Sequence, residues 1–225
     1  MDYRTWIPVY ERILADFGYS RVADERARDT LATLVEPFDE SRFDPVAGAT
    51  VAVAGAGPSL VEESGVAADA DLVFAASTAA KTLRENGIDV DLMVTDLDKT
   101  PATARTLTRG GVPVAVHAHG DNVPAVEEWV PRLDGDHVVP TTQAEPRGPV
   151  ANYGGFTDGD RAAFLADAFG AARLQFPGWD FDDPSLDATK RRKLIWAERL
   201  LAWLERRRDE RFAVLDGRRG DVELP

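Results

Sequence analysis

Two carboxylates stand close together after an apolar segment of this chain. Asp96 and Asp98 follow residues 92–94, whose composition is typical of a short strand. In an extended chain, residues two apart point to the same side, so both side chains can direct their oxygens at one point. Proteins usually hold Mg²⁺ with one or two carboxylates together with substrate phosphates. The pair therefore predicts a magnesium site for phosphoryl or nucleotidyl transfer. Two solvated acids at a strand end are the alternative interpretation.

A glycine-rich turn, Gly-Ala-Gly-Pro-Ser-Leu, ends the apolar run at residues 50–54. A strand followed by such a turn and a helix start presents backbone N–H groups and the positive end of the helix dipole to an anion. Proline at the first helical position favours that start. We therefore expect phosphate to bind at Gly55, Gly57, Pro58 and Ser59. The third glycine of a dinucleotide fingerprint is missing, which disfavours NAD. A purely structural turn stays open as the alternative.

Two more polar runs precede predicted helices. The first, His-Ala-His-Gly-Asp-Asn, occupies 117–122, and the second, Asn-Tyr-Gly-Gly-Phe-Thr-Asp-Gly-Asp-Arg, occupies 152–161. Glycines in the second run allow close backbone approach, and one of its Thr or Asp residues is expected to cap the following helix. The first run is similar to the ligand set of binuclear zinc hydrolases. However, the chain has only three histidines, too few for a site built mostly of imidazoles.

Strand and helix patterns alternate along residues 50–215. The apolar runs expected as strands are 50–54, 72–76, 92–94, 112–116, 138–139, 171–176 and 212–215, and the helical stretches include 77–86, 102–109, 123–133, 162–169 and 189–208. Repeated strand–helix units predict an α/β fold, a doubly wound, mostly parallel, Rossmann-like sheet with helices on both faces. Ligands of such sheets bind at the carboxyl ends of the strands. The glycine turn, the aspartate pair and the histidine run all fall at that predicted edge.

The N-terminal part has a different pattern. Two amphipathic helices, broken near Gly18, are expected between residues 3 and 35, and a polar connector leads to Gly48. We predict an N-terminal helical extension at 1–47 and an α/β catalytic domain at 48–225. The extension could cover the site or form a subunit contact, and a homo-oligomer stays open.

Composition excludes several classes of partner. The chain has 225 residues, of which 39 are acidic and 26 basic, for a formal charge of −13. Such a chain repels nucleic acid and anionic membranes, so we expect neither as a partner. The acidic, lysine-poor composition is typical of a protein from a high-salt cytosol. There is no cysteine, no membrane-length apolar run and no signal-peptide pattern, which predicts a cytoplasmic protein.

Half of the four lysines lie at one predicted helix start. Lys190 and Lys193 open the helix expected at 189–208. Cations at that position oppose the helix dipole, so a bound polyanion explains them better than helix stability does. Solvated charge is the alternative interpretation.

Four blocks together resemble a known family. They are Gly-Ala-Gly-Pro-Ser-Leu at 55–60, Thr-Asp-Leu-Asp at 95–98, the run at 117–122, and Gly-Phe-Thr-Asp-Gly-Asp-Arg at 155–161. In order and spacing they are similar to the archaeal 6-hydroxymethyl-7,8-dihydropterin pyrophosphokinases, which are related to the thiamin pyrophosphokinase catalytic domain. The resemblance covers roughly residues 50–200. Lys99 departs from the pattern, in which glycine is more usual.

The resemblance implies the substrates and the roles of the site residues. It implies ATP and a reduced pterin as substrates, Mg²⁺ as cofactor, and AMP and a pterin diphosphate as products, for folate or methanopterin-type coenzymes. Asp96, Asp98 and Asp121 would bind the metal, and His119 would position the hydroxyl or act as a base. The other implied contacts are Lys190, Lys193 and Arg161 for phosphate charge, Asn122, Asn152, Thr157, Asp158 and Asp160 for the pterin, and His117 behind the site.

Related domains leave a second function open. They occur in glycosyltransferases that share the block at 55–60, so this block does not distinguish the two. A nucleotide-sugar-dependent transferase, or a nucleotide-binding module without turnover, is therefore the alternative. Release of AMP would separate these functions.

Overall fold

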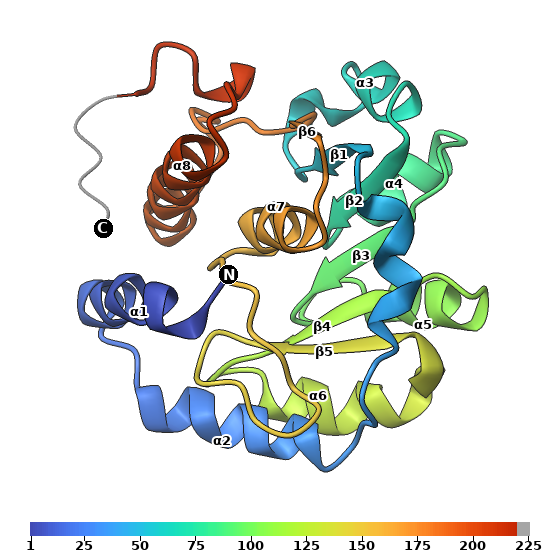
Figure 1. Cartoon of the computed structure of the whole chain (residues 1–225), viewed down its shortest axis with the longest axis vertical. Helices are drawn as coiled ribbons and strands as arrows, with labels where there is room; N and C mark the ends of the chain where they lie inside the picture. Colours follow the sequence, from blue (N-terminus) through green and yellow to red (C-terminus); the bar gives the residue numbers. More distant parts are fainter. Residues whose placement is uncertain (220–225) are drawn as a thin grey trace.

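A six-stranded parallel sheet forms the centre of the computed structural model, which describes residues 1–219 (Figure 1). The strand order is β5-β4-β3-β2-β1-β6. The strands are β1 (Thr50–Ala54), β2 (Leu72–Ala76), β3 (Leu92–Thr95), β4 (Val114–Ala118), β5 (Val138–Thr142) and β6 (Arg173–Gln175). Their near-continuous apolar sequences fit a sheet that helices cover on both faces. The predicted doubly wound α/β fold is confirmed.

The chain builds the sheet in one direction and then turns back. The helices α3 (Ser64–Ala68), α4 (Ala79–Glu85), α5 (Pro101–Arg109) and α6 (Val123–Trp129) join β1 to β5 in sequence, and α7 (Asp158–Ala168) leads back to β6, beside β1. Because parallel crossovers are right-handed, this reversal places α7 on the opposite face. The core accordingly has two clusters, one on each face of the sheet. The strand order reverses between β1 and β6, the place where such sheets bind ligands.

The two N-terminal helices pack on opposite faces of the sheet. α1 (Tyr3–Phe17) begins at its cap Asp2 and ends at the left-handed Gly18, where the break was predicted. It packs beside α7 through Trp6, whose ring contacts Phe164 (Figure 1). α2 (Arg21–Ala32) packs on α6 and on the ends of β4 and β5. Residues 1–47 therefore share both cores with the sheet, and the domain boundary at 47/48 stays a prediction.

The C-terminal segment contains one wrong prediction. Residues 212–215 were expected as a strand but form a turn of 3-10 helix, Ala213–Leu215. Phe212 and Leu215 are buried against the long helix α8 (Ala188–Arg208), and Glu205 of that helix accepts a hydrogen bond from the Phe212 N–H at 2.7 Å. The apolar run thus covers a helix instead of pairing with a strand. Residues 220–225, the end of the predicted catalytic domain, lie outside the described part.

Helix ends also differ from expectation. The helix expected over 123–133 ends at Trp129 and continues as a 3-10 turn, Val130–Arg132, because Pro131 has no N–H to donate. After the glycine turn only a 3-10 turn, Pro58–Leu60, and the short α3 form. Within residues 1–219, no helix combines the length and apolar content that crossing a bilayer requires.

Candidate active site

Two adjoining cavities lie along the carboxyl edge of the sheet. The switch-point cavity, of about 400 Å³, lies over the ends of β1 and β2 beside the segment that follows β6, and is lined by residues that include Gly55, Gly57, Ser77, Trp179 and Asp180. The aspartate cavity, of about 370 Å³, lies over β3 and β4 and is lined by residues that include Asp24, Asp96, Asp98, His119 and Arg161. Lys99, Thr157, Asp158 and Lys190 line both. Groups bound in the two cavities would therefore meet at these shared residues.

The two aspartates meet through a tight turn after β3. Leu97 between them has a left-handed backbone, φ +67°, and a side chain that is 2 % exposed. The Asp98 N–H donates to Asp96 Oδ1 at 3.1 Å, and the Leu97 N–H donates to Thr95 Oγ1 at 3.0 Å. The expected pair is present, but the extended geometry predicted for it is wrong, because burial of Leu97 turns the chain.

The two carboxylates of the aspartate pair shift each other's pKa values in opposite directions. Burial and then the neighbouring Asp96 carboxylate raise the pKa of Asp98 to about 6. Burial acts in the same direction on Asp96, but hydrogen bonds from His119 and Asp98 outweigh it and hold the pKa of Asp96 below its ordinary value. Two crowded carboxylates of which one tends to keep a proton suit a hard divalent cation, which takes oxygen ligands. The donor set therefore fits Mg²⁺.

The third predicted metal ligand stands apart from this pair. Within the described residues, no group of three or more His, Cys, Asp or Glu side chains is placed to share one ion. Asp121 lines the same cavity but is exposed, and its charge acts on Tyr19 at the rim. The structure thus brings Asp96 and Asp98 together and leaves Asp121 outside the pair.

A fixed turn after β4 places His119 beside the pair. His119 Nε2 lies 3.5 Å from Asp96 Oδ2. Asn122 holds this turn, because its Nδ2 donates to the backbone oxygens of Asp96 and His117 and its Oδ1 accepts from the His119 N–H. Asn122 is thus engaged by backbone groups at every polar atom, instead of facing a ligand as predicted.

His117 lines the aspartate cavity although its side chain is almost completely buried. It is 1 % exposed, and its ring stacks on that of His119 with centroids 6.0 Å apart. Burial and then the charge of Arg161 lower its pKa well below the ordinary value, so the ring is neutral. The third histidine, His137, precedes β5 and therefore lies at the amino edge of the sheet, opposite His117 and His119.

The glycine turn is closed by another part of the chain. The N–H groups of Gly55 and Gly57 donate to the carbonyls of Pro177 and Gly178, each at 2.9 Å. A Cβ at Gly55 would lie 2.4 Å from Gly178 O, so a side chain does not fit there. The glycines are thus needed because the chain's own segment 177–180 approaches the turn closely.

A carboxylate takes the place expected for phosphate. Asp180 Oδ2 accepts hydrogen bonds from Ser59 N at 3.0 Å and from Ser59 Oγ at 2.8 Å. Pro58 does begin a helical turn, but one of three residues, whose dipole is small. In this arrangement the Ser59 N–H donates to Asp180, and the N–H groups of Gly55 and Gly57 donate to backbone carbonyls, so the donors that were predicted for phosphate already have partners within the chain.

Sequence reasoning missed Ser77 on the neighbouring strand. Ser77 follows β2, has a left-handed backbone with φ +49°, and lines the switch-point cavity. Its buried Oγ has no hydrogen-bond partner among residues 1–219. Because non-glycine residues avoid this conformation and buried hydroxyls are normally paired, both features indicate a functional position. The signal available in the sequence was a Ser-Thr pair directly after an apolar strand.

The start of α7 divides the predicted pterin-binding residues. Asp160 is buried and accepts from the Thr157 N–H and Oγ, which makes it half of a capping box. Asp158 lines both cavities, and burial followed by the charge of Asp96 raises its pKa to about 8. Thr157 also lines both cavities. Asp160 therefore serves the helix, while Asp158 and Thr157 face the site.

Arg161 and Asn152 have contacts other than those expected. The Arg161 Nη2 donates to Gln143 Oε1 at 2.9 Å and to Phe156 O at 2.7 Å, and Arg161 lines the aspartate cavity. Asn152 lines neither large cavity. Its Nδ2 donates to Gln143 O and Ala144 O, and it holds that loop in place.

The predicted lysines gather where the cavities join. Lys190 lines both cavities, and Lys193 lines the aspartate cavity. Burial and then the nearby charge of Lys99 lower the pKa of Lys190. Asp187 caps α8 through the Lys190 N–H at 2.8 Å. The aspartate cavity is lined by three ammonium groups and by the carboxylates of the aspartate pair and Asp158; the ammonium groups are those of Lys99, Lys190 and Lys193. Such a combination suits a ligand that carries both phosphate and metal.

Fold and site together define a doubly wound α/β protein with two joined ligand cavities at the carboxyl edge of its sheet. The chain belongs to the 6-hydroxymethylpterin diphosphokinase MptE-like family, whose model matches residues 25–185. The resemblance seen in the four blocks is thereby confirmed. Because diphosphokinases are transferases, the expected enzyme class is confirmed as well.

Three archaeal relatives extend the match to nearly the whole chain. Each is called 6-hydroxymethyl-7,8-dihydropterin pyrophosphokinase. The protein of Methanothermobacter thermautotrophicus is 38% identical over 94% of this chain and 99% of its own length. The protein of Pyrococcus furiosus is 37% identical over 91% of this chain and 95% of its own length. The protein of Methanocaldococcus jannaschii is 31% identical over 91% of this chain and 96% of its own length.

Proposed function

We propose that this protein transfers the terminal diphosphate of ATP to the hydroxymethyl group of 6-hydroxymethyl-7,8-dihydropterin. The observation that carries the proposal is the pair of joined cavities, whose shared residues Lys99, Asp158 and Lys190 lie beside the aspartate pair. Transfer between two bound substrates needs positioning and charge neutralisation more than a covalent intermediate. The relatives' names supply the acceptor, and the product would feed a folate or methanopterin-type coenzyme.

Each cavity would take one substrate. The switch-point cavity would hold the nucleotide, because Ser77 offers an unpaired hydroxyl there and such sheets bind nucleotides at the switch point. The aspartate cavity would hold the pterin, with Phe156 and Tyr19 as aromatic walls. The phosphates would then lie between the cavities, beside Lys99 and Lys190.

The chemistry would be an in-line displacement. The pterin hydroxyl oxygen attacks the β-phosphorus, the bond from that phosphorus to the α,β-bridging oxygen breaks, and AMP leaves with the electron pair. His119, whose Nε2 lies 3.5 Å from Asp96 Oδ2, would take the hydroxyl proton. Lys190 and Lys193 would neutralise phosphate charge. Asp96 and Asp98 would hold Mg²⁺, which supplies further neutralisation of the phosphates.

A product assay tests the proposal. The protein is incubated at high salt with ATP, Mg²⁺ and the dihydropterin, and AMP and pterin diphosphate are measured by chromatography. Equal amounts of both products are expected, with none when the pterin is omitted or a chelator is added. Folded protein that binds ATP without forming AMP would contradict the proposal and favour a nucleotide-binding module.

A further inference from the structure

The floor of the aspartate cavity is polar although it is buried. Asp24 from α2, Gln143 after β5 and Arg161 from α7 all line it. These side chains are 3 %, 3 % and 6 % exposed, respectively. Charged residues are rarely this buried without a pairing or functional reason. We call these three residues the polar strip.

Hydrogen bonds arrange the polar strip in one order. Gln143 Nε2 donates to Asp24 Oδ2 at 2.7 Å, and Gln143 Oε1 accepts from Arg161 Nη2 at 2.9 Å. A carboxylate only accepts and a guanidinium only donates. The amide of Gln143 therefore cannot flip without two mismatched contacts. Along the strip the available groups are a carboxylate, an amide oxygen and a guanidinium, which is acceptor, acceptor, donor.

Each member keeps hydrogen-bonding capacity beyond these contacts. Asp24 also accepts from Tyr10 Oη and from Gly120 N, each at 2.7 Å, which fills three of about four lone-pair sites of a carboxylate. The oxygen of an amide has two lone pairs, and Gln143 Oε1 uses one of them to accept from Arg161 Nη2. Arg161 uses Nη2 for Gln143 and Phe156, two of the five N–H donors that a guanidinium has.

We propose that the polar strip recognises the 2-amino-4-oxopyrimidine edge of the acceptor substrate, an inference that rests on the proposed function. This edge presents an amino group, a ring N–H and a carbonyl oxygen, which is donor, donor, acceptor. Asp24 accepts from the amino group, Gln143 Oε1 accepts from the ring N–H, and Arg161 donates to the carbonyl. The order of the edge matches the order of the strip.

This assignment also orients the substrate. The hydroxymethyl group lies at the opposite end of the bicyclic ring from the aminopyrimidinone edge. With that edge on the polar strip, the hydroxymethyl group points away from the floor, toward the residues that the two cavities share. Asp24 thereby makes α2 part of substrate recognition, a role for the N-terminal helices that is neither a cover nor a subunit contact.

The test compares two acceptors in the intact protein and in Asp24→Asn. The second acceptor is the 2-oxo analogue, 6-hydroxymethyl-7,8-dihydrolumazine, which carries a carbonyl where the pterin carries the amino group. Wild type should prefer the pterin in kcat/KM by about 10- to 100-fold, the range of one charge-assisted hydrogen bond. In Asp24→Asn the preference should fall to about threefold or less, because an amide can also donate to the new carbonyl. A ratio is unaffected by a loss of active protein.

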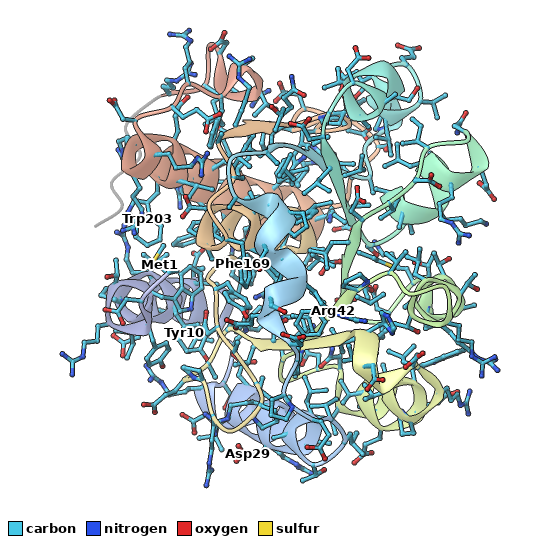
Figure 2. All side chains as sticks on the ribbon, turned by 45° about the vertical axis from the view of Figure 1, so that its right-hand side comes forward. Met1, Tyr10, Asp29, Arg42, Phe169 and Trp203 are labelled. Atoms are coloured by element: carbon cyan, nitrogen blue, oxygen red, sulfur yellow. The ribbon has the colours of Figure 1, made fainter. Side chains whose placement is uncertain are left out.

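Asp29→Asn is the matched control. Asp29 lies on the outer side of the same helix and contacts Arg28 and Arg147 outside the cavity (Figure 2). It should keep the wild-type ratio. An unchanged ratio in Asp24→Asn would overturn the inference. Equal kcat/KM values for the two acceptors in wild type would also overturn it, and this measurement tests the inference even if the variant does not fold. Absence of AMP from wild type with the pterin would instead overturn the proposed function.

Discussion

Two residues with left-handed backbones stand at the edge where the substrates would bind. Ser77 follows β2 and Leu97 follows β3, with φ values of +49° and +67°. Each costs about 1–2 kcal/mol relative to an ordinary conformation, so the surrounding packing must hold it. The buried side chain of Leu97 holds its backbone in this conformation. As a result, Asp96 and Asp98 face one point.

At the residue scale, Asp96→Asn tests the aspartate pair. The substitution keeps Oδ1 as the acceptor for the Asp98 N–H but removes one negative charge. We expect kcat for AMP formation to fall by at least about 100-fold, since a group that holds the metal contributes several kcal/mol. The midpoint of thermal unfolding should change little.

Asp121→Asn is the companion variant. Because Asp121 is exposed and stands apart from the pair, its substitution should reduce kcat by less than about tenfold, the size expected for an interaction of the rim. A loss as large as that of Asp96→Asn would restore Asp121 as a ligand. Full activity of Asp96→Asn would contradict the metal site itself.

Ser77→Ala tests the residue that sequence reasoning missed. Loss of the unpaired Oγ should raise KM for ATP by about three- to tenfold, the effect of one hydrogen bond. Stability should stay the same or rise, because a buried hydroxyl without a partner is removed. Steady-state kinetics and thermal unfolding measure both. A lower unfolding midpoint with unchanged KM would show that Ser77 is structural.

At the element scale, the segment 177–180 holds the glycine turn closed. Besides the backbone contacts, Trp179 Nε1 donates to Val53 O at 2.8 Å, and the Gly178 N–H donates to Glu63 Oε2 at 2.7 Å. This segment comes directly after β6, the strand added when the chain reverses. The glycine turn therefore depends on the return crossover for its shape.

Gly57→Ala tests that closure. A Cβ at Gly57 would lie 2.2 Å from Asp180 Oδ2 and 2.8 Å from Gly178 O, so one of the two segments must move. We expect a loss of about 1–3 kcal/mol in the free energy of unfolding, as for overpacking elsewhere. Gly65→Ala in α3 is the control, because nothing lies within 4 Å of its Cβ position, and it should be neutral or stabilising. Equal effects of the two substitutions would contradict the closure.

At the scale of the whole molecule, net charge should control stability. A formal charge of −13 disfavours the folded state through self-repulsion. Raising KCl from about 0.1 M to about 1 M shortens the Debye length from about 10 Å to about 3 Å. The midpoint of thermal unfolding, followed by circular dichroism, should rise over this range. A midpoint that falls with KCl would contradict the expectation.

Much of the fold could be predicted because its signals are local. Apolar runs such as 50–54 and 72–76 became strands β1 and β2, and Gly18 ended the first helix. The run at 212–215 failed because an apolar segment can pack on a helix as well as pair with a strand, and only the partner decides. The contacts of segment 177–180 with Gly55 and Gly57 could not be predicted, since they join residues more than a hundred positions apart.

The sequence by itself determined the parallel sheet, the carboxyl edge where its polar runs meet, and the family, because periodicity and motif spacing are carried by neighbouring residues. Only the tertiary structure decided which of those polar groups face a ligand. Asn122, Asn152 and Asp160 are engaged by backbone and caps, while Asp24 and Ser77 reach the cavities. The physical reason is that a buried polar group must find a partner, and that partner comes from whichever distant segment the fold places beside it.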